Sequence, residues 1–234
     1  MTLMKKPRVL IADDHSILVA GLRKLLEDTC EIVGTVEDGQ ALIRAAERLK
    51  PDLILSDISM PLLNGLDAAR QIKKSLPDVK LLFLTMHASP AYATEALKAG
   101  ASGFLLKQSA ATELPQAIEA VLKGQTYLTP SVTKLVLDRI LRPGEAELKS
   151  SAMDLTPRQR EVLQLVAEGR STKDVANLLS ISAKTVEFHK NRIMEQLDLH
   201  STPALIKFAI AEGLVCMESR PAPLNLPSPG PHDS

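Results

Sequence analysis

The chain has 234 residues, enough for one large or two ordinary domains, and 45% of them are hydrophobic, which excludes a largely disordered protein. Basic and acidic residues number 28 each, so the net charge is zero and bulk attraction gives no reason to expect nucleic-acid binding. Cys30 and Cys216 lie far apart, which argues against a disulfide scaffold or a zinc site and favours a reducing compartment. We find no signal-peptide core and no apolar stretch of the roughly 18 residues that a membrane span needs, and so expect a cytoplasmic protein.

Residues 7–123 are predicted to form an α/β domain in which strands and helices alternate. Apolar runs predict strands near 8–12, 31–36, 52–56, 80–85 and 103–106, and amphipathic segments predict helices near 15–28, 39–48, 64–75, 90–99 and 110–123. Five such units predict a doubly wound parallel sheet of the flavodoxin-like type. The continuous apolar run Leu53-Ile54-Leu55 fits a strand that is buried on both faces.

Polar residues stand at the carboxyl ends of four predicted strands. Asp13 and Asp14 follow the first strand, Asp57 the third, Thr85 ends the fourth and Lys107 follows the fifth. Because these strand ends share one edge of a parallel sheet, we expect the side chains to meet in one pocket. Asp14 and Asp57 could bind Mg²⁺, with Asp13 orienting a bound water. Asp57 suits the role of a nucleophile that accepts a phosphoryl group, while Lys107 and Thr85 would stabilise charge on the phosphoryl oxygens.

Each of these residues has a simpler interpretation when it is taken alone. Asp, Thr and Lys at strand ends are common helix caps and surface charges, but four successive matches favour a site. His15 and His87 flank the pocket and are candidate metal ligands or acid/base groups, although a solvated loop position is the commoner role.

The remainder of the chain is predicted to be a linker, a helical domain and a tail. The linker covers 124–150, with a loop at 124–130 and a helix near 131–141; the helical domain covers 151–216 and has four segments; and the proline-rich residues 217–234 are expected to be disordered. Thr156, Ser171 and Ser182 have the positions of helix N-caps in the helical domain.

The third helix of this domain, from Ala183 to Leu197, is amphipathic. Val186, Ile193 and Leu197 share one face and are predicted to be core residues. The opposite face and its flanks carry Lys184, Phe188, Asn191, Glu195, Glu187 and Arg192, a mixture that fits contacts with phosphates and base edges in a major groove. Residues 151–215 contain eight basic and eight acidic residues, however, so a protein-binding bundle would have the same composition.

Residues 7–123 resemble a response-regulator receiver domain. The resemblance is carried by Val9-Leu10-Ile11-Ala12-Asp13-Asp14-His15, Ser56-Asp57-Ile58-Ser59-Met60-Pro61, Asn64-Gly65, Thr85 and Gly100 to Lys107. It implies that a partner histidine kinase phosphorylates Asp57 with Mg²⁺ present, and that the backbone carbonyl of Ser59 joins Asp13, Asp14 and Asp57 in the metal site. It also implies that Phe104 is an aromatic switch, which turns inward when Thr85 moves toward the phosphoryl group. Gln108 departs from the proline that many receivers have after the lysine.

The helical domain resembles the LuxR-type helix-turn-helix. The matching stretches are Leu155 to Leu163, Val166-Ala167-Glu168-Gly169, Val175-Ala176, Ile181-Ser182, Lys184 to His189 and Gly213-Leu214-Val215. With the receiver, nearly the whole chain up to residue 215 is similar to a NarL/FixJ-type response regulator. The resemblance makes Lys184, Thr185, Lys190 and Arg192 candidates for phosphate contacts, and Glu187, Phe188 and Asn191 candidates for base-edge readout.

We therefore expect a two-component transcriptional regulator that is not an enzyme. At rest the receiver would pack against the helix-turn-helix and mask its third helix; phosphorylation would release it, and a homodimer would bind adjacent half-sites of promoter DNA, with RNA polymerase as a further candidate partner. An aspartyl-phosphate phosphatase would need an aspartate two residues after Asp57, where Ser59 stands. The alternative is a phosphorylation-independent DNA-binding factor whose receiver serves only for dimerisation.

Overall fold

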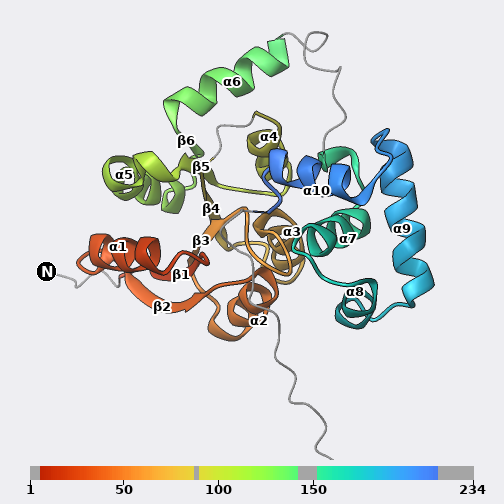
Figure 1. Cartoon of the computed structure of the whole chain (residues 1–234). Helices are drawn as coiled ribbons and strands as arrows, with labels where there is room; N and C mark the ends of the chain where they lie inside the picture. The colour runs from red at the N-terminus through yellow and green to blue at the C-terminus, as the bar shows by residue number, and fades with distance from the viewer. Residues whose placement is uncertain (1–5, 87–89, 142–151, 216–234) are drawn as a thin grey trace, which may run out of the picture.

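The computed structural model describes residues 6–86, 90–141 and 152–215, which form an α/β part and a helical part (Figure 1). The strands are β1 (Arg8–Ala12), β2 (Glu31–Val36), β3 (Leu53–Asp57), β4 (Lys80–Thr85), β5 (Gly103–Leu106) and β6 (Tyr127–Leu128). The helices of the α/β part are α1 (Ser16–Leu26), α2 (Gly39–Leu49), α3 (Gly65–Ser75), α4 (Pro90–Lys98), α5 (Ala110–Leu122) and α6 (Pro130–Leu141). Those of the helical part are α7 (Pro157–Ala167), α8 (Thr172–Leu178), α9 (Ala183–Gln196) and α10 (Thr202–Ala211), and single 3₁₀ turns cover Lys107–Ser109 and Ala152–Asp154.

The predicted doubly wound parallel sheet is confirmed, with one more strand than expected. The strand order is β2-β1-β3-β4-β5-β6, and every pair is parallel. β6 lies where we predicted a loop: Tyr127 pairs with Gly103 and Leu128 with Phe104, so the linker uses backbone groups that the edge of β5 leaves free. The order in which successive strands are added to the sheet reverses between β1 and β3, and ligands of such sheets bind at the carboxyl ends of the strands near this point.

Alternate residues of the strands build two hydrophobic layers. Leu10, Ile54, Phe83 and Phe104 pack on the side of α2, α3 and α4, where α6 adds Val132 and Val136. Val9, Ile11, Leu55, Leu84 and Leu105 pack against α1 and α5 on the other side. Figure 1 shows α1 and α5 together on one side of the sheet and α2 and α3 on the other. Every residue of β3 is buried, as its continuous apolar run predicts.

The helical part has its own core and begins its helices where predicted. Thr156, Ser171 and Ser182 are the N-caps of α7, α8 and α9, and the first two form complete capping boxes. Side chains from all four helices, among them Val162, Val186, Ile193 and Leu205, form one buried cluster. Within the described residues, no helix is long and apolar enough to cross a membrane. The predicted disordered tail, Cys216 and His87 lie outside the described residues.

Candidate functional site

Asp57 lies at the carboxyl end of the central strand β3 and is 3% exposed. The backbone N–H groups of Ile58 and Ser59 donate to its Oδ1 at 2.6 and 3.3 Å. Gly65, the first residue of α3, approaches the strand so closely that a Cβ there would lie 2.0 Å from the Asp57 carbonyl oxygen. The Asn64-Gly65 pair therefore lets the helix close over the backbone of Asp57.

Lys107 binds this carboxylate from the 3₁₀ turn after β5. Its Nζ lies 2.7 Å from Asp57 Oδ2 and 2.8 Å from Asp13 Oδ2, and all three side chains are almost fully buried. Burial tends to lower the pKa of Lys107, but Asp57 and Asp13 outweigh it and raise the pKa above its usual value. Burial also raises the pKa of Asp57, against the opposing charge of Lys107. The ammonium is therefore charged, and it neutralises only part of the local carboxylate charge.

The acidic end of the pocket has the donor set of a hard divalent cation. Asp13, Asp14, His15 and Asp57 each place one possible ligand atom within 4.8 Å of the others. Three carboxylates facing one ammonium leave excess negative charge, and carboxylate oxygens are the ligands that Mg²⁺ takes. His15 is more engaged than a solvated loop residue, because its Nδ1 lies 3.0 Å from both Asp13 Oδ1 and Asp14 Oδ1.

Thr85 lies at the same edge of the sheet as this pocket, and Phe104 lies on the neighbouring strand β5. Thr85 ends β4, one residue beyond the partner of Asp57 in the sheet register, and is 3% exposed. Phe104 is fully buried in the layer beneath α4 and α6. Its carbonyl accepts from the N–H of Thr129, so the expected switch strand is bonded to the start of the linker.

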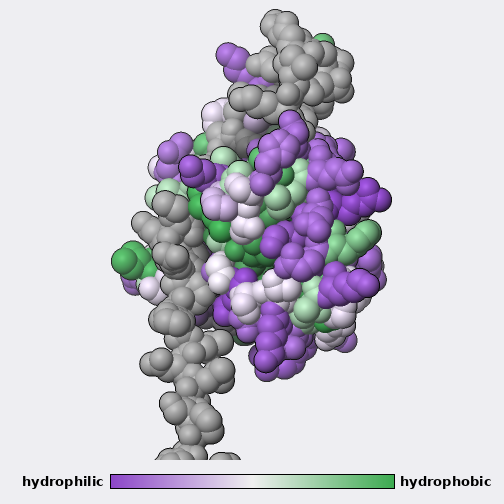
Figure 2. All heavy atoms as spheres, turned by 45° about the vertical axis from the view of Figure 1, so that its right-hand side comes forward, coloured by the Kyte–Doolittle hydropathy of each residue, from purple (hydrophilic) through white to green (hydrophobic). Residues whose placement is uncertain are grey.

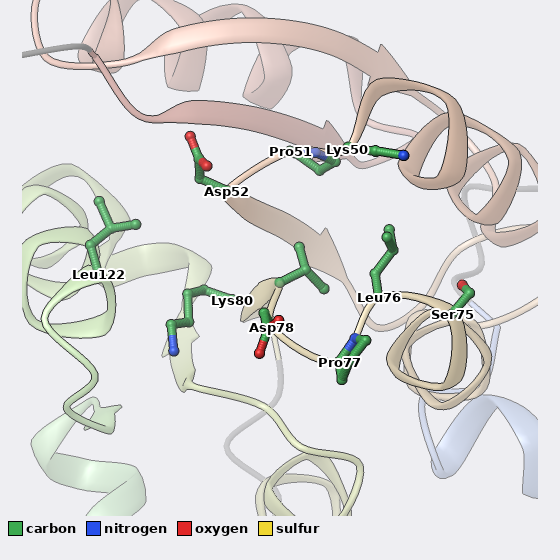
Figure 3. Close-up of a pocket in the computed structure, with 10 residues that line it drawn as sticks. Lys50, Pro51, Asp52, Ser75, Leu76, Pro77, Asp78, Lys80 and Leu122 are labelled. Atoms are coloured by element: carbon green, nitrogen blue, oxygen red, sulfur yellow. The ribbon is translucent and has the colours of Figure 1, made fainter.

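A separate hollow lies at the opposite, amino-terminal edge of the strands (Figure 3). Its volume is about 490 Å³, and Asp52, Asp78, Leu76 and Leu122 are among its lining residues. Asp52 accepts a 2.8 Å hydrogen bond from the backbone of Arg8, a structural role at the start of β3. The carboxylates that converge on Lys107 are all at the other edge.

Helix α9 presents the predicted DNA-contacting face to solvent. Val186, Ile193 and Leu197 are buried, as predicted, whereas the side chains of the outer face, Lys184, Phe188, Asn191, Arg192 and Glu195, are exposed. Figure 2 shows hydrophilic side chains over most of the visible face of the molecule, with smaller apolar areas between them.

Some of the candidate DNA-contacting residues interact with neighbouring side chains of the helical part. Glu187 accepts from Thr172 Oγ1 at 2.7 Å and lies 3.3 Å from Lys190 Nζ. The bond from Thr172 is the main reason that the pKa of Glu187 is lowered. Arg192 stacks over Phe188, with its Cζ 5.9 Å from the ring centroid.

The expected masking of α9 is wrong, although the two parts do pack together. The α/β part contacts α7 and the residue just after it, the 3₁₀ turn Ala152–Asp154 and Gly213, and α9 lies on the far side of the helical part (Figure 1). Arg160 of α7 donates from Nε and Nη2 to the carboxylate of Asp67 in α3, at 3.0 and 2.8 Å. The amphipathic pattern of a short helix shows which face is buried, but not which neighbour buries it.

The residues of this contact were missed by sequence reasoning. Arg160 and Gln164 in α7 and its C-cap residue Glu168 are spaced four apart on one face, and all three are buried. The available signal was Gln164, a polar residue inside the apolar run from Val162 to Val166. Its buried amide needs a hydrogen-bond acceptor, and it finds the carbonyl of Met60 at 2.6 Å.

Comparison with known families agrees with this architecture. Residues 9–119 match the model of the response regulator receiver domain, and residues 153–209 match that of bacterial regulatory proteins of the luxR family. Oxygen regulatory protein NreC of Staphylococcus epidermidis is 35% identical over 89% of this chain and 99% of its own length. Transcriptional regulatory protein MctR of Rhizobium johnstonii is 34% identical over 92% of this chain and 98% of its own.

Solved structures of response regulators are also similar to this chain. An RcsB response regulator from Salmonella typhimurium is 33% identical, with a TM-score of 0.65, over 89% of this chain and 99% of its own. An RcsB–DNA complex is 32% identical, with a TM-score of 0.55 and the same coverage. The chain belongs to the two-component response regulators that join a receiver domain to a LuxR-type DNA-binding domain and regulate transcription.

Proposed function

We propose that Asp57 is the phosphoacceptor of this regulator and that a sensor histidine kinase is the donor. A carboxylate oxygen of Asp57 forms the new P–O bond as the P–N bond to the kinase histidine breaks. Lys107 already lies 2.7 Å from Asp57 Oδ2 and offsets the added negative charge, and Thr85, one residue beyond the sheet partner of Asp57, donates to a phosphoryl oxygen. The observation that carries this proposal is the buried meeting of Asp57, Asp13 and Lys107 at the carboxyl edge of the sheet.

The proposed metal is Mg²⁺, held by the side chains of Asp13, Asp14 and Asp57 and the backbone carbonyl of Ser59. The close carboxylates support this choice, and the cation would supply positive charge against the transferring phosphoryl oxygens. Phe104 is proposed to follow Thr85 as the switch residue.

The proposed DNA contacts lie on α9. Lys184, Thr185, Lys190 and Arg192 contact phosphates, and Glu187, Phe188 and Asn191 read base edges; exposure of most of this set supports the assignment. Because α9 is already exposed, we propose that phosphorylation controls how two copies assemble on adjacent half-sites rather than whether the helix is uncovered. The regulator acts in the cytoplasm, where its DNA lies, catalyses no reaction on a separate substrate and has RNA polymerase as a candidate partner.

The same exposure favours one alternative, a DNA-binding factor that needs no phosphorylation. The test compares promoter DNA binding of the wild type and Asp57→Asn, each with and without acetyl phosphate and Mg²⁺. We expect the donor to tighten binding at least about tenfold in the wild type and to leave Asp57→Asn unchanged. Tight wild-type binding with no response to the donor would support the alternative.

A further inference from the structure

The loop between β3 and α3 joins the proposed phosphorylation site to the DNA-binding domain. It follows Asp57 directly, and three of its residues hydrogen-bond to the helical part. Ser59 Oγ donates to the carbonyl of Gly213 at 2.5 Å, the carbonyl of Met60 accepts from Gln164 Nε2 at 2.6 Å, and the N–H of Leu62 donates to Glu168 Oε1 at 3.0 Å. The segment that includes the proposed metal ligand Ser59 is thus held from outside the receiver.

Leu62 shows that this loop is under strain. Its φ is +65°, a left-handed conformation that costs energy for a leucine. Its side chain packs against the core of the helical part, beside the docked face of α7. Strained conformations persist where surrounding contacts enforce them. Here the packing of the side chain and the bond to Glu168 come from the DNA-binding domain, while a 2.7 Å hydrogen bond from the N–H of Leu63 to the carbonyl of Pro61 closes the turn within the loop itself.

A buried ion pair fixes the register of this contact. Arg160 and Asp67 are 4% and 2% exposed, and they are joined by two hydrogen bonds. Asp67 lies in the first turn of α3, just after the loop, and it also accepts from Asn64 Nδ2 at 2.9 Å. The loop is therefore held at both its middle and its end by the helical part.

We infer that Gln164 and Glu168 are positioning residues for the phosphorylation of Asp57, because they hold the Ser59–Leu62 segment in its unphosphorylated geometry; this rests on the proposed function of the pocket. In that geometry the N–H groups of Ile58 and Ser59 are bonded to the free Asp57 carboxylate. A phosphoryl group on Asp57 changes the acceptor of these N–H groups, so the loop must rearrange. The hydrogen bonds from Gln164 and Glu168 oppose this rearrangement. Linkage is reciprocal: the docked α7 opposes phosphorylation, and phosphorylation opposes docking to the same extent.

Residue-resolved hydrogen exchange and calorimetry on the full chain test the inference, with beryllofluoride and Mg²⁺ as the phosphoryl mimic. Gln164→Met removes the amide that bonds Met60 and keeps a side chain of similar length. Leu62→Gly removes both the strain and the packed side chain, and serves as a second, independent variant. Gln196→Met is the matched control, because it removes an amide bonded to the Asp154 carbonyl, away from the loop.

In the wild type, the mimic should speed amide exchange at Leu62 at least about fivefold, the lower bound of typical coupling. Gln164→Met and Leu62→Gly should bind the mimic at least about fivefold more tightly, with Gln196→Met unchanged. If the wild type binds the mimic while exchange at Leu62 stays constant, or if both variants bind it like the wild type, the inference is wrong. If the wild type does not bind the mimic at all, the proposed function of the pocket fails instead.

Discussion

Removing Asp67 should weaken docking of the two domains more than removing Arg160, because the two side chains have different neighbours. Without Arg160, the Asp67 carboxylate still accepts from Arg70 Nη1 at 2.6 Å and from Asn64 Nδ2 at 2.9 Å. Without the Asp67 carboxylate, a buried guanidinium loses the charged acceptor of two of its N–H groups, while its bond to the neutral Leu155 carbonyl remains. We expect Asp67→Asn to weaken docking of the two domains by about 3 kcal/mol and Arg160→Met by about 1–2 kcal/mol.

A loss of about 3 kcal/mol lowers a docking constant roughly 150-fold, enough to separate the domains in a contact of ordinary strength. Small-angle X-ray scattering would then show a larger radius of gyration for Asp67→Asn than for Arg160→Met. Glu95→Gln is the control, because it removes the second carboxylate bonded to Arg70, at 2.7 Å, inside the receiver. An Arg160→Met chain that expands more than Asp67→Asn would refute the reasoning.

The same pair gives a dependence on pH with a definite sign. Burial tends to raise the pKa of Asp67, but the bonds and charge of Arg160, together with Asn64 and Arg70, outweigh it and lower the pKa. Its stabilising contribution is therefore complete above the unfolded value of about 3.9 and is lost as the pH falls through the lower folded value. The acid midpoint of unfolding, followed by circular dichroism, should move up in Arg160→Met.

Four other substitutions test the pocket and the DNA-binding helix. Lys107→Met should slow phosphorylation by acetyl phosphate about 10²–10³-fold, yet tighten Mg²⁺ binding in calorimetry, because a competing ammonium leaves the carboxylates. Asn191→Ala should cost about 1–3 kcal/mol at one base pair and relax specificity there, whereas Lys184→Ala should weaken all sequences alike and reduce the salt slope by about 1; binding titrations at several salt concentrations separate the two. Gly65→Ala should destabilise the receiver by about 1–3 kcal/mol in thermal melts, because its Cβ would overlap the Asp57 carbonyl; an unchanged melt would contradict the close approach.

The elements that sequence predicted well are those set by local pattern. Parallel strands place their carboxyl ends at one edge, so the meeting of Asp57, Asp13 and Lys107 followed from the positions of three strand ends. The buried and exposed faces of α9 followed from helical periodicity. β6 was missed because a two-residue strand has almost no pattern of its own, and it forms only because the edge of β5 is free.

Docking of α7 escaped prediction for a related reason, and it changes how control must work. The buried face of α7 serves both its own domain and the receiver, and periodicity does not divide that face between two neighbours. Because the outer face of α9 is exposed while the two domains are docked, DNA binding does not require that this face be uncovered first. Docking restricts the orientation of the DNA-binding domain. Under the assembly proposed above, it therefore also restricts how two α9 helices are placed on adjacent half-sites.

The contact between the receiver and the DNA-binding domain has the composition expected of a switch whose docked and undocked states differ little in free energy. A buried ion pair adds little net stability, because desolvation offsets its attraction, but it strongly disfavours any misaligned docking. Open clefts of about 760 and 340 Å³ border the contact, one lined by Asp67 and Pro157 among others and one by Leu62 and Leu178 among others, so apolar packing between the domains is incomplete. Moving a two-state equilibrium from 1:99 to 99:1 takes about 5.5 kcal/mol. The loss of a few hydrogen bonds and of the Leu62 packing is of that order, and a phosphoryl group at the proposed acceptor Asp57 would have to overcome it.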